Sequence, residues 1–457
     1  MDIERIRTVG LGNTSHLVAA GRDAVVIDPP RDAWRVMAAA ERRGWRITHV
    51  LETHVHNDYL SGALELRAAL DAEILAPARG GYAFDHRPMD EGDGLELDGL
   101  RLTARATPGH TPEHLAWDLS TASDPTDGGP EAIATGGSLL VGSAGRTDLL
   151  GPDLMERLTG DQFRTLRRLA ELDDAVVVLP THGGGSFCSV GPADGATETT
   201  IGRERWVNPL FQIVDRPTFR ETLFAGLGPY PTYYREMAPI NRAGPVVHGR
   251  LPVVPLIGPD AVRGALASGA SLVDGRARTA FAAAHIPRSV NIELRDSFAS
   301  YVGWFLPFGE PLVLVLPEPV QESLEAAVGH LFRIGYDRIL GALDGGVEAW
   351  EAAGGPTAAY AVTSGRATRQ AMADDRDPIL LDVRDPQELR EDGHLPDAIE
   401  MPMGDLADRL DTLPRDRPIT VLCRSGSRAS IAASLLDGAG FEVRLVAAGG
   451  ARDLLGR

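Results

Sequence analysis

The stretch Glu52-Thr53-His54-Val55-His56-Asn57-Asp58-Tyr59 directly follows an apolar run at residues 47–51. Alternate residues of an extended segment share one face. The side chains of His54, His56 and Asp58 are therefore expected to point the same way where a strand gives way to a loop. Loops at strand ends commonly carry functional residues on a rigid scaffold. The stretch predicts a metal or catalytic site at the end of a strand.

Three further candidate residues also follow apolar segments: His110 in Thr107-Pro-Gly-His-Thr-Pro, Asp148 in Gly145-Arg-Thr-Asp, and His182 in Pro180-Thr-His-Gly. A lone histidine in such a place is more often a capping or hydrogen-bonded core residue, but the whole set is typical of a metal site. Short apolar runs between helical patterns predict stacked layers of strands and helices around it.

Length and composition limit the organisation of the chain. At roughly 150 residues per domain, its 457 residues predict about three domains, and breaks rich in Pro and Gly place them at 1–245, 250–355 and 362–457. A net charge of −19 argues against a nucleic-acid partner. With 43% hydrophobic and 24% charged residues and two cysteines, we expect a soluble, cytoplasmic protein without membrane spans or a disulfide framework.

The domains at 250–355 and 362–457, here called the first copy and the second copy, repeat one pattern. Ser271-Leu-Val-Asp-Gly-Arg276 matches Ile379-Leu-Leu-Asp-Val-Arg384, at an offset of 108 residues. Near the same offset, His285-Ile-Pro matches His394-Leu-Pro, residues 311–316 match 418–423, and Gly345-Gly matches Gly449-Gly. The repeats predict a duplicated α/β domain with short parallel strands joined by helices.

Cys423 ends an apolar strand of the second copy and begins the loop Cys423-Arg-Ser-Gly-Ser-Arg428, which runs into a helical stretch. Backbone N–H groups at a helix N-terminus, together with Arg424 and Arg428, are expected to favour a thiolate and then an anionic persulfide. The first copy has Leu316 at the equivalent position and cannot carry a persulfide. Cys188 is expected to have a packing role, with sulfur acceptance as the alternative.

The first set of motifs resembles the metallo-β-lactamase fold in its persulfide dioxygenase branch. The resemblance rests on Thr-His-x-His-x-Asp, Gly-His, Gly-Arg-Thr-Asp and Pro-Thr-His-Gly-x-Gly-Ser-Phe-Cys. It implies an αββα sandwich with one Fe(II) per chain, held by His54, His110 and Asp148. Two imidazoles and one carboxylate leave metal positions open for oxygen and substrate. The resemblance further implies residues that orient ligands or substrate: His56, Asp58 and His182. The alternative for His56 is direct metal binding in a zinc variant.

The cysteine loop resembles that of rhodaneses, the sulfurtransferase family, and its four-residue Cys-to-Arg spacing argues against a phosphatase. The whole chain is similar to bacterial fusions of a persulfide dioxygenase with a degenerate and an active rhodanese. This resemblance implies that a small-molecule thiol persulfide and O2 give sulfite in sulfide detoxification. Cys423 would then move sulfane sulfur, with thiosulfate formed or consumed. The sequence leaves the oligomeric state undecided, with a homo-oligomer as one of the assemblies it allows.

Two alternatives stay open. Tyr59 follows Asp58 at a position where the family that the motifs resemble usually has a histidine. A second metal would lose that ligand, which argues against a two-metal hydrolase. A mononuclear zinc thioester hydrolase similar to glyoxalase II remains as the first alternative. The second alternative is a persulfide relay or sensor without catalysis at the metal site.

Overall fold

The structure, a computed structural model, describes residues 1–121, 129–191, 195–373 and 378–456. The chain divides into two compact units. One comprises Met1–Pro252 with Phe332–Gly335, and the other comprises Val253–Leu331 with Tyr336–Arg457. The second unit thus holds most of both copies, and the boundaries 1–245, 250–355 and 362–457 stay predictions.

Two six-stranded sheets form the centre of the first unit. The first sheet has the order β1 (Asp2–Thr8), β2 (Asn13–Ala19), β3 (Asp23–Ile27), β4 (Arg46–Leu51), β5 (Glu73–Pro77), β6 (Arg87–Met89). The second has the order β14 (Thr199–Thr200), β13 (Val177–Pro180), β10 (Ala132–Gly136), β9 (Leu115–Thr121), β8 (Leu100–Ala106), β7 (Gly94–Leu97). A separate small ribbon pairs β11 (Leu139–Leu140) with β12 (Ser143–Ala144).

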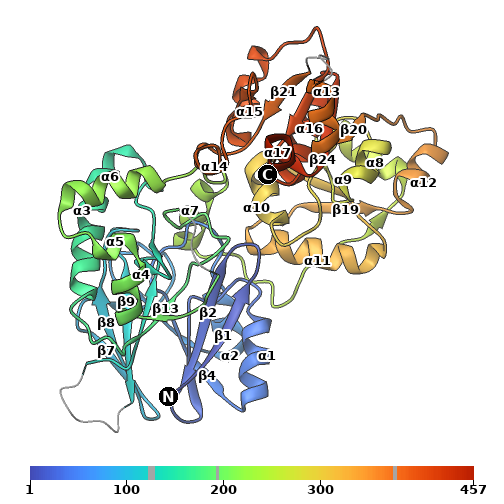
Figure 1. Ribbon diagram of the computed structural model, residues 1–457. Coiled ribbons are helices and arrows are strands. Elements are labelled where there is room, and N and C mark those ends of the chain that lie inside the picture. Colours follow the sequence, from blue (N-terminus) through green and yellow to red (C-terminus); the bar gives the residue numbers. More distant parts are fainter. Residues whose placement is uncertain (122–128, 192–194, 374–377, 457) are drawn as a thin grey trace. The chain divides into compact units, whose positions relative to one another are not determined.

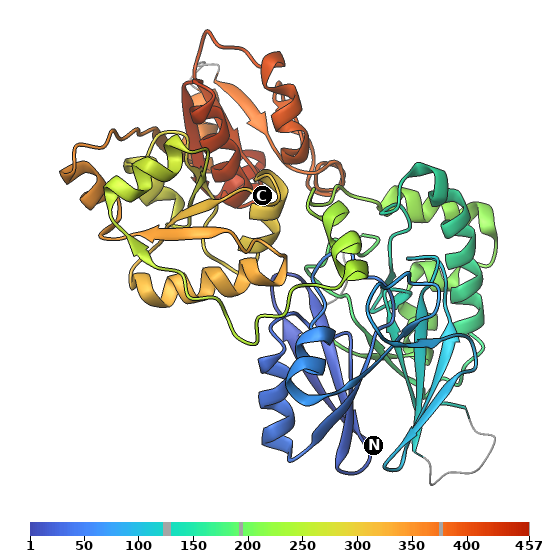
Figure 2. The same cartoon turned by 180° about the vertical axis from the view of Figure 1, so that it is seen from behind.

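Helices cover the outer faces of both sheets, as Figures 1 and 2 show. The first sheet packs against α1 (Trp34–Arg43) and α2 (Ala63–Leu70). The helices that follow the second sheet's strands, or interrupt them, are α3 (Pro152–Leu169), α4 (Ile201–Val207), α5 (Pro209–Gln212), α6 (Arg216–Gly226) and α7 (Tyr234–Ala243).

The alternation of side chains along the strands explains these layers. In β3, Val25 and Ile27 enter the core between the two sheets, whereas Ala24 and Val26 enter the core beneath α1 and α2. In β10, Ile133 joins the core with α3 to α6. Successive residues of a strand point to opposite faces, so a sheet that is apolar on both faces needs a layer on each side. The αββα sandwich expected from the sequence is confirmed.

The second unit contains two five-stranded sheets with the same strand order. In the first copy the order is β15 (Leu256–Ile257), β19 (Ile339–Leu343), β18 (Leu312–Val315), β16 (Ser271–Asp274), β17 (Val290–Asn291). In the second copy it is β20 (Ala361–Ser364), β24 (Val443–Ala448), β23 (Ile419–Leu422), β21 (Ile379–Asp382), β22 (Ile399–Glu400). All neighbouring strands are parallel. The predicted duplication is confirmed.

Helices connect these strands. Those of the first copy are α8 (Pro259–Ala267), α9 (Arg278–Ala283), α10 (Phe298–Phe305), α11 (Val320–Arg333) and α12 (Gly346–Ala352). Those of the second copy are α13 (Gly365–Ala373), α14 (Pro386–Asp392), α15 (Leu406–Arg409), α16 (Ser427–Gly438) and α17 (Gly450–Leu455), with short 3₁₀ turns at Met403–Asp405 and Leu410–Thr412. Throughout the described ranges, every helix is too short or too polar to cross a lipid bilayer.

Candidate metal centre and cysteine loop

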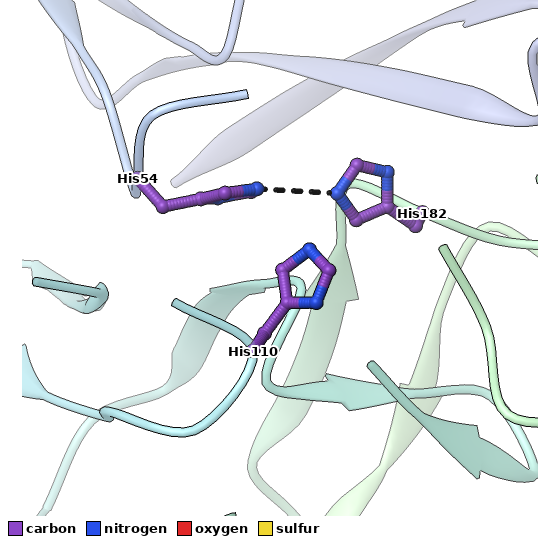
Figure 3. Close-up of side chains that lie close together, drawn as sticks. All are labelled: His54, His110 and His182. Atoms are coloured by element: carbon purple, nitrogen blue, oxygen red, sulfur yellow. Dashed lines mark hydrogen bonds between the residues drawn. The ribbon is translucent and has the colours of Figure 1, made fainter. Parts of the chain in front are cut away.

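Three histidines from separate segments meet at the ends of strands in the first unit. His54 follows β4, His110 lies in the loop between β8 and β9, and His182 follows β13. One ring nitrogen from each lies within 4.8 Å of the others, and all three residues are buried. Figure 3 shows the rings facing one another, and the Nε2 atoms of His54 and His182 are 3.3 Å apart.

Hydrogen bonds at the far side of each ring fix which nitrogen faces the cluster. Thr53 donates its hydroxyl to Asp28 Oδ2 at 2.7 Å. The same Thr53 oxygen lies 2.8 Å from His54 Nδ1 and therefore accepts a hydrogen bond from the N–H at that position. The lone pair of His54 is left on Nε2, which faces His182.

The other two rings follow the same rule. His110 Nδ1 lies 2.7 Å from the carbonyl oxygen of Arg146. His182 Nδ1 is hydrogen-bonded to Asn13 Oδ1 at 3.4 Å, and Asp58 Oδ2 lies 3.1 Å from the same nitrogen. All of these oxygens are acceptors, so each Nδ1 donates and each Nε2 keeps its lone pair. Metal-binding histidines typically donate their second nitrogen to a carbonyl or carboxylate in this way.

The ionisation of the cluster also suits a cation. Burial lowers the pKa of His54 well below its usual value and lowers that of His110 to about 3, so both rings are neutral at physiological pH. The buried His110 Nε2 has no hydrogen-bond partner among the described residues. Three converging lone pairs with one orphaned nitrogen are the donor set of a metal site, and the residues fit a single divalent metal.

His56 lies beside this cluster and carries a different charge. Its Nε2 is 3.0 Å from Glu52 Oε2 and 3.3 Å from Asp28 Oδ1. Burial opposes the charged ring, but Asp28 and Glu52 outweigh it and raise the pKa of His56 to about 10. The hydroxyl of Tyr59 lies 3.1 Å from the same nitrogen. His56 is thus an imidazolium held by carboxylates.

Two overlapping groups also bring three ligand atoms together, Asp28 with His54 and His56, and His56 with Asp58 and His182. Both include His56, whose Nε2 already contacts the carboxylates of Glu52 and Asp28. In the histidine trio the Nε2 atoms of His54 and His182 face each other instead, and this geometry favours the trio as the metal site.

Asp148, the third expected iron ligand, contacts an arginine. Arg146 binds its carboxylate through two contacts of 2.7 Å, and among the described residues Asp148 belongs to no group of three candidate ligands. The structure thus groups His182 with His54 and His110, while Asp148 is taken up by an arginine two residues before it. The iron role of Asp148 stays a prediction.

Several residues that hold the site carry no signal in the sequence pattern. Asn241 of α7 donates to the carbonyls of His56 and Tyr59 at 2.9 and 2.8 Å and so fixes the loop. His114 stacks on His54 with ring centroids 4.8 Å apart. Gly137 donates its backbone N–H to His114, and a Cβ at Gly137 would lie 2.3 Å from His110. These contacts join residues far apart in the chain, which no local pattern reveals.

A small cavity of about 10 Å³, which is room for about one water molecule, borders His54 and His56. Its lining combines polar Glu52, His54 and His56 with apolar Leu64 and Phe84.

In the second unit, Cys423 lies at the N-terminus of α16. Its sulfur accepts hydrogen bonds from the backbone N–H groups of Gly426 at 3.1 Å and Ala429 at 3.4 Å. Cys423 is 1% exposed. N–H groups at a helix start favour a bound negative charge, so the geometry suits a thiolate or a persulfide.

The two predicted arginines are engaged by carboxylates. Arg428 pairs with Asp385 at 2.8 Å and with Glu388 at 2.5 Å, and Arg424 pairs with Asp392 at 3.1 Å. Burial opposes the charge of Arg428, but Glu388 and Cys423 raise its pKa. Arg428 therefore stays charged near the sulfur, while the cradle around the sulfur itself is made of backbone.

The second cysteine is placed unlike the first. Cys188 is fully buried, and burial, followed by the charge of Asp58, raises the pKa of its thiol well above the usual value. A protonated, buried thiol fits the packing role expected for Cys188.

Comparisons with known proteins divide the chain in the same way. A profile of the metallo-beta-lactamase superfamily matches residues 8–182. A profile of the rhodanese-like domain matches twice, at residues 259–353 and 367–452.

Two curated relatives are named hydroxyacylglutathione hydrolase. The one from Methylobacillus flagellatus is 32% identical over 151 residues, which cover 33% of this chain and 53% of that protein. The one from Synechococcus sp. (strain WH7803) is 30% identical over 195 residues, which cover 42% of this chain and 67% of that protein. The chain thus spans between about half and two thirds of their lengths.

Among solved structures, a metallo-beta-lactamase from Staphylococcus aureus subsp. aureus COL is 25% identical, covers 75% of this chain and 98% of its own, and has a TM-score of 0.67. ETHE1 from Myxococcus xanthus is 26% identical, covers 53% of this chain and 99% of its own, and has a TM-score of 0.45. The first match is longer than the first unit, so the shared architecture extends into the second.

Proposed function

Because the chain belongs to the metallo-β-lactamase superfamily and carries two rhodanese-like domains, we propose that it oxidises a low-molecular-weight thiol persulfide and transfers sulfane sulfur at Cys423. The observation that carries the proposal is the Cys423 sulfur held by the N–H groups of Gly426 and Ala429. That cradle suits sulfur transfer, and a metal site in the same chain then has a sulfur substrate at hand.

The balanced reactions are simple. A persulfide RSSH, O2 and water give the thiol RSH, sulfite and two protons. A second RSSH passes its outer sulfur to the Cys423 thiolate and leaves as RSH, which gives the anionic Cys423 persulfide. That persulfide then passes its outer sulfur to sulfite, so that the S–S bond to Cys423 breaks, a new one forms in thiosulfate, and the Cys423 thiolate leaves. When bound, one Fe(II) per chain supplies the redox chemistry of the first reaction.

The residues of the first unit prepare that site. Asp58 orients His182, and the carbonyl of Arg146 orients His110. Leu64 and Phe84 line the small cavity beside His54 and give this side of the site an apolar surface. Asp28 and Glu52 hold the ring of His56, two residues after His54.

A second candidate function is a mononuclear zinc thioester hydrolase. It is favoured by the three-histidine donor set, which also suits zinc with one open position, and by relatives whose names denote hydrolysis of hydroxyacylglutathione.

One set of assays separates the candidates. The protein, purified without oxygen, is analysed for metal and given glutathione persulfide in an oxygen electrode, then a hydroxyacyl-glutathione thioester under argon. We expect about one iron per chain and persulfide-dependent oxygen uptake. Zinc with anaerobic thioester cleavage would establish the hydrolase, and sulfur transfer without either reaction would establish a relay.

A matched pair of variants identifies the ligands. If the metal is held by His54, His110 and His182, His182→Ala loses bound metal whereas Asp148→Asn retains it. If Asp148 is the third ligand, the order reverses, and His182→Ala is expected to weaken metal affinity by about 10–100-fold. His110→Ala should lose the metal in both cases, and His394→Ala, an exposed histidine of the second copy, serves as the control.

A further inference from the structure

Arg278, the first residue of α9 in the first copy, extends its side chain into the cysteine loop of the second copy. Its Nη1 donates to the carbonyl oxygen of Ser425 at 2.8 Å and lies 3.3 Å from that of Ala447. Its Nη2 donates to Ser427 Oγ at 3.0 Å. Arg278 is 8% exposed, so these contacts are shielded from water.

Glu293, also in the first copy, holds Arg278 in this position. Its carboxylate accepts from Arg278 Nη2 at 2.7 Å and from the backbone N–H of Arg278 at 3.1 Å. Glu293 therefore holds both the backbone N–H and the guanidinium of Arg278. The bond to the guanidinium is charge-assisted and hence stronger than a neutral hydrogen bond.

The contact with Ser425 bears directly on the sulfur. The carbonyl of Ser425 and the N–H of Gly426 belong to one peptide unit, and in a planar trans peptide they point in opposite directions. Arg278 holds the carbonyl end of this unit, and the N–H end donates to Cys423 Sγ at 3.1 Å. A cation on the carbonyl also polarises the peptide and strengthens its N–H as a donor.

Close packing leaves this peptide little freedom to turn. Gly426 has φ +99°, and a Cβ there would lie 2.2 Å from Arg278 Nη1 and 2.6 Å from the carbonyl oxygen of Ala447. The left-handed conformation favours glycine, and glycine also leaves room for the guanidinium.

We propose that Arg278 is a positioning residue for Cys423: the copy that lacks a thiol supplies the group that orients the Gly426 N–H toward the sulfur of the other copy. This inference rests on the proposed sulfur transfer at Cys423. It gives the first copy a role in catalysis, because the Cys423 cradle is complete only when Arg278 occupies it.

The test compares Arg278→Met, which keeps the stem and removes the donors, with Arg278→Lys, which keeps the charge. The control is Arg295→Met, because Arg295 also pairs with Glu293 but is an exposed residue. Full-length proteins are assayed for sulfur transfer from thiosulfate to cyanide, for alkylation of Cys423 by uncharged iodoacetamide at pH 7, and for melting temperature. Reaction at Cys188 is subtracted with the Cys423→Ser variant.

Loss of one oriented donor predicts a kcat about 10–100-fold lower in Arg278→Met. Alkylation of Cys423 should slow by about tenfold, because the thiolate loses an aligned N–H. Arg278→Lys should recover part of both rates, and Arg295→Met should match the wild type. If Arg278 had a merely structural role, Arg278→Met would not slow the alkylation of Cys423 while leaving the melting temperature unchanged.

The outcomes separate the two ideas. A wild-type protein without sulfur transfer overturns the proposed function. An active wild type with Arg278→Met alkylated and turning over within about twofold of it overturns the positioning role, and so does a lower kcat with unchanged alkylation. If Arg278→Met does not fold, Glu293→Gln, which loosens the arginine but keeps it, should give an intermediate loss of both rates, and full rates there would also overturn the role.

Discussion

The first and second copies share a scaffold but differ at the end of one central strand. After β23 the chain enters the loop of Cys423, where backbone N–H groups surround the sulfur. After β18 it reaches buried Leu316 and then Pro317-Glu-Pro. Pro319 stands at the position of Gly426 and has no N–H, so the first copy lacks this donor of the sulfur cradle as well as the thiol.

The scaffold itself is retained in both copies. Asp274 pairs with Arg276 at 2.6 Å in the first copy, and Asp382 pairs with Arg384 at 2.7 Å in the second. Each arginine also donates to a carbonyl further along the chain. The two copies thus share the ion pair and the sheet while their loops differ, as expected where a site is carried by the fold.

The charges around the loop have changed as well. The second copy has Asp385, Glu388 and Arg428 around its loop. At the equivalent positions the first copy has Ala277, Ala280 and Gln321. The second copy thus has a local network of charges at positions where the first copy has uncharged residues, and four substitutions test the contrast.

The largest expected effect is that of Cys423→Ser. A serine hydroxyl stays un-ionised near neutral pH, so transfer of sulfur from thiosulfate to cyanide should fall to background. Persulfide-dependent oxygen uptake should persist, because the candidate metal ligands lie in the other unit. Sulfite should then accumulate in place of thiosulfate, which ion chromatography measures.

The contrary result would be equally informative. If oxygen uptake vanished together with sulfur transfer in a folded Cys423→Ser protein, Cys423 would deliver the substrate to the metal centre, and the two sites would not be independent.

Leu316→Ala probes the corresponding position of the inactive copy. Leu316 is 4% exposed, and truncating a buried leucine costs about 2–5 kcal/mol of stability. Denaturant unfolding should show this loss, while sulfur transfer by the folded protein stays at the wild-type rate. A stable Leu316→Ala protein with impaired transfer would contradict the division of roles between the copies.

The shared scaffold of the two copies, and the difference between Cys423 and Leu316, could largely be predicted from the sequence. Apolar runs that end in Asp-x-Arg and a regular offset are local signals, and they identified β16, β21 and the strand that leads to Cys423. The histidine motifs likewise identified strand ends, because buried strands and the polar residues after them are adjacent in the chain.

Contacts between residues far apart in the chain could not be predicted from the sequence. The approach of His182 to His54 depends on how two sheets stack, and the position of Asp148 depends on a turn that lets Arg146 reach its carboxylate. Arg278 and Ser425 are 147 residues apart in sequence, and an arginine at a helix start resembles any surface arginine. Such placements follow from packing, which periodicity does not encode.

Gly426→Ala tests the geometry of the active loop alone. A non-glycine residue at φ +99° is strained by about 1–3 kcal/mol, and its Cβ would meet Arg278 and the Ala447 carbonyl. We expect sulfur transfer to fall by about tenfold or more. Gly438→Ala is the control, because a Cβ there meets its nearest atom at 3.6 Å, and wild-type activity in Gly426→Ala would show that the loop tolerates distortion.

The smallest expected effect concerns the charges that the second copy has added. Burial raises the pKa of Glu388, but Arg428 outweighs burial and holds that pKa below its ordinary value. A carboxylate with a lowered native pKa contributes stability above the pKa of the unfolded state, about 4.3, and loses it as the pH falls through the native pKa. The pair with Arg428 should therefore act fully at pH 7.

Glu388→Gln removes this contribution. Both side chains are partly exposed, at 16% and 14%, and Arg428 keeps Asp385 as a partner, so we expect a loss of about 1 kcal/mol at pH 7. The difference from the wild type should shrink below about pH 4, as Glu388 is protonated in the wild-type protein. Denaturant unfolding across pH 3 to 8 measures it, with Glu391→Gln on the exposed side of α14 as the control. A difference that is constant over the whole range would mean that Glu388 acts through packing rather than charge, and the added charges of the second copy would then have no part in its stability.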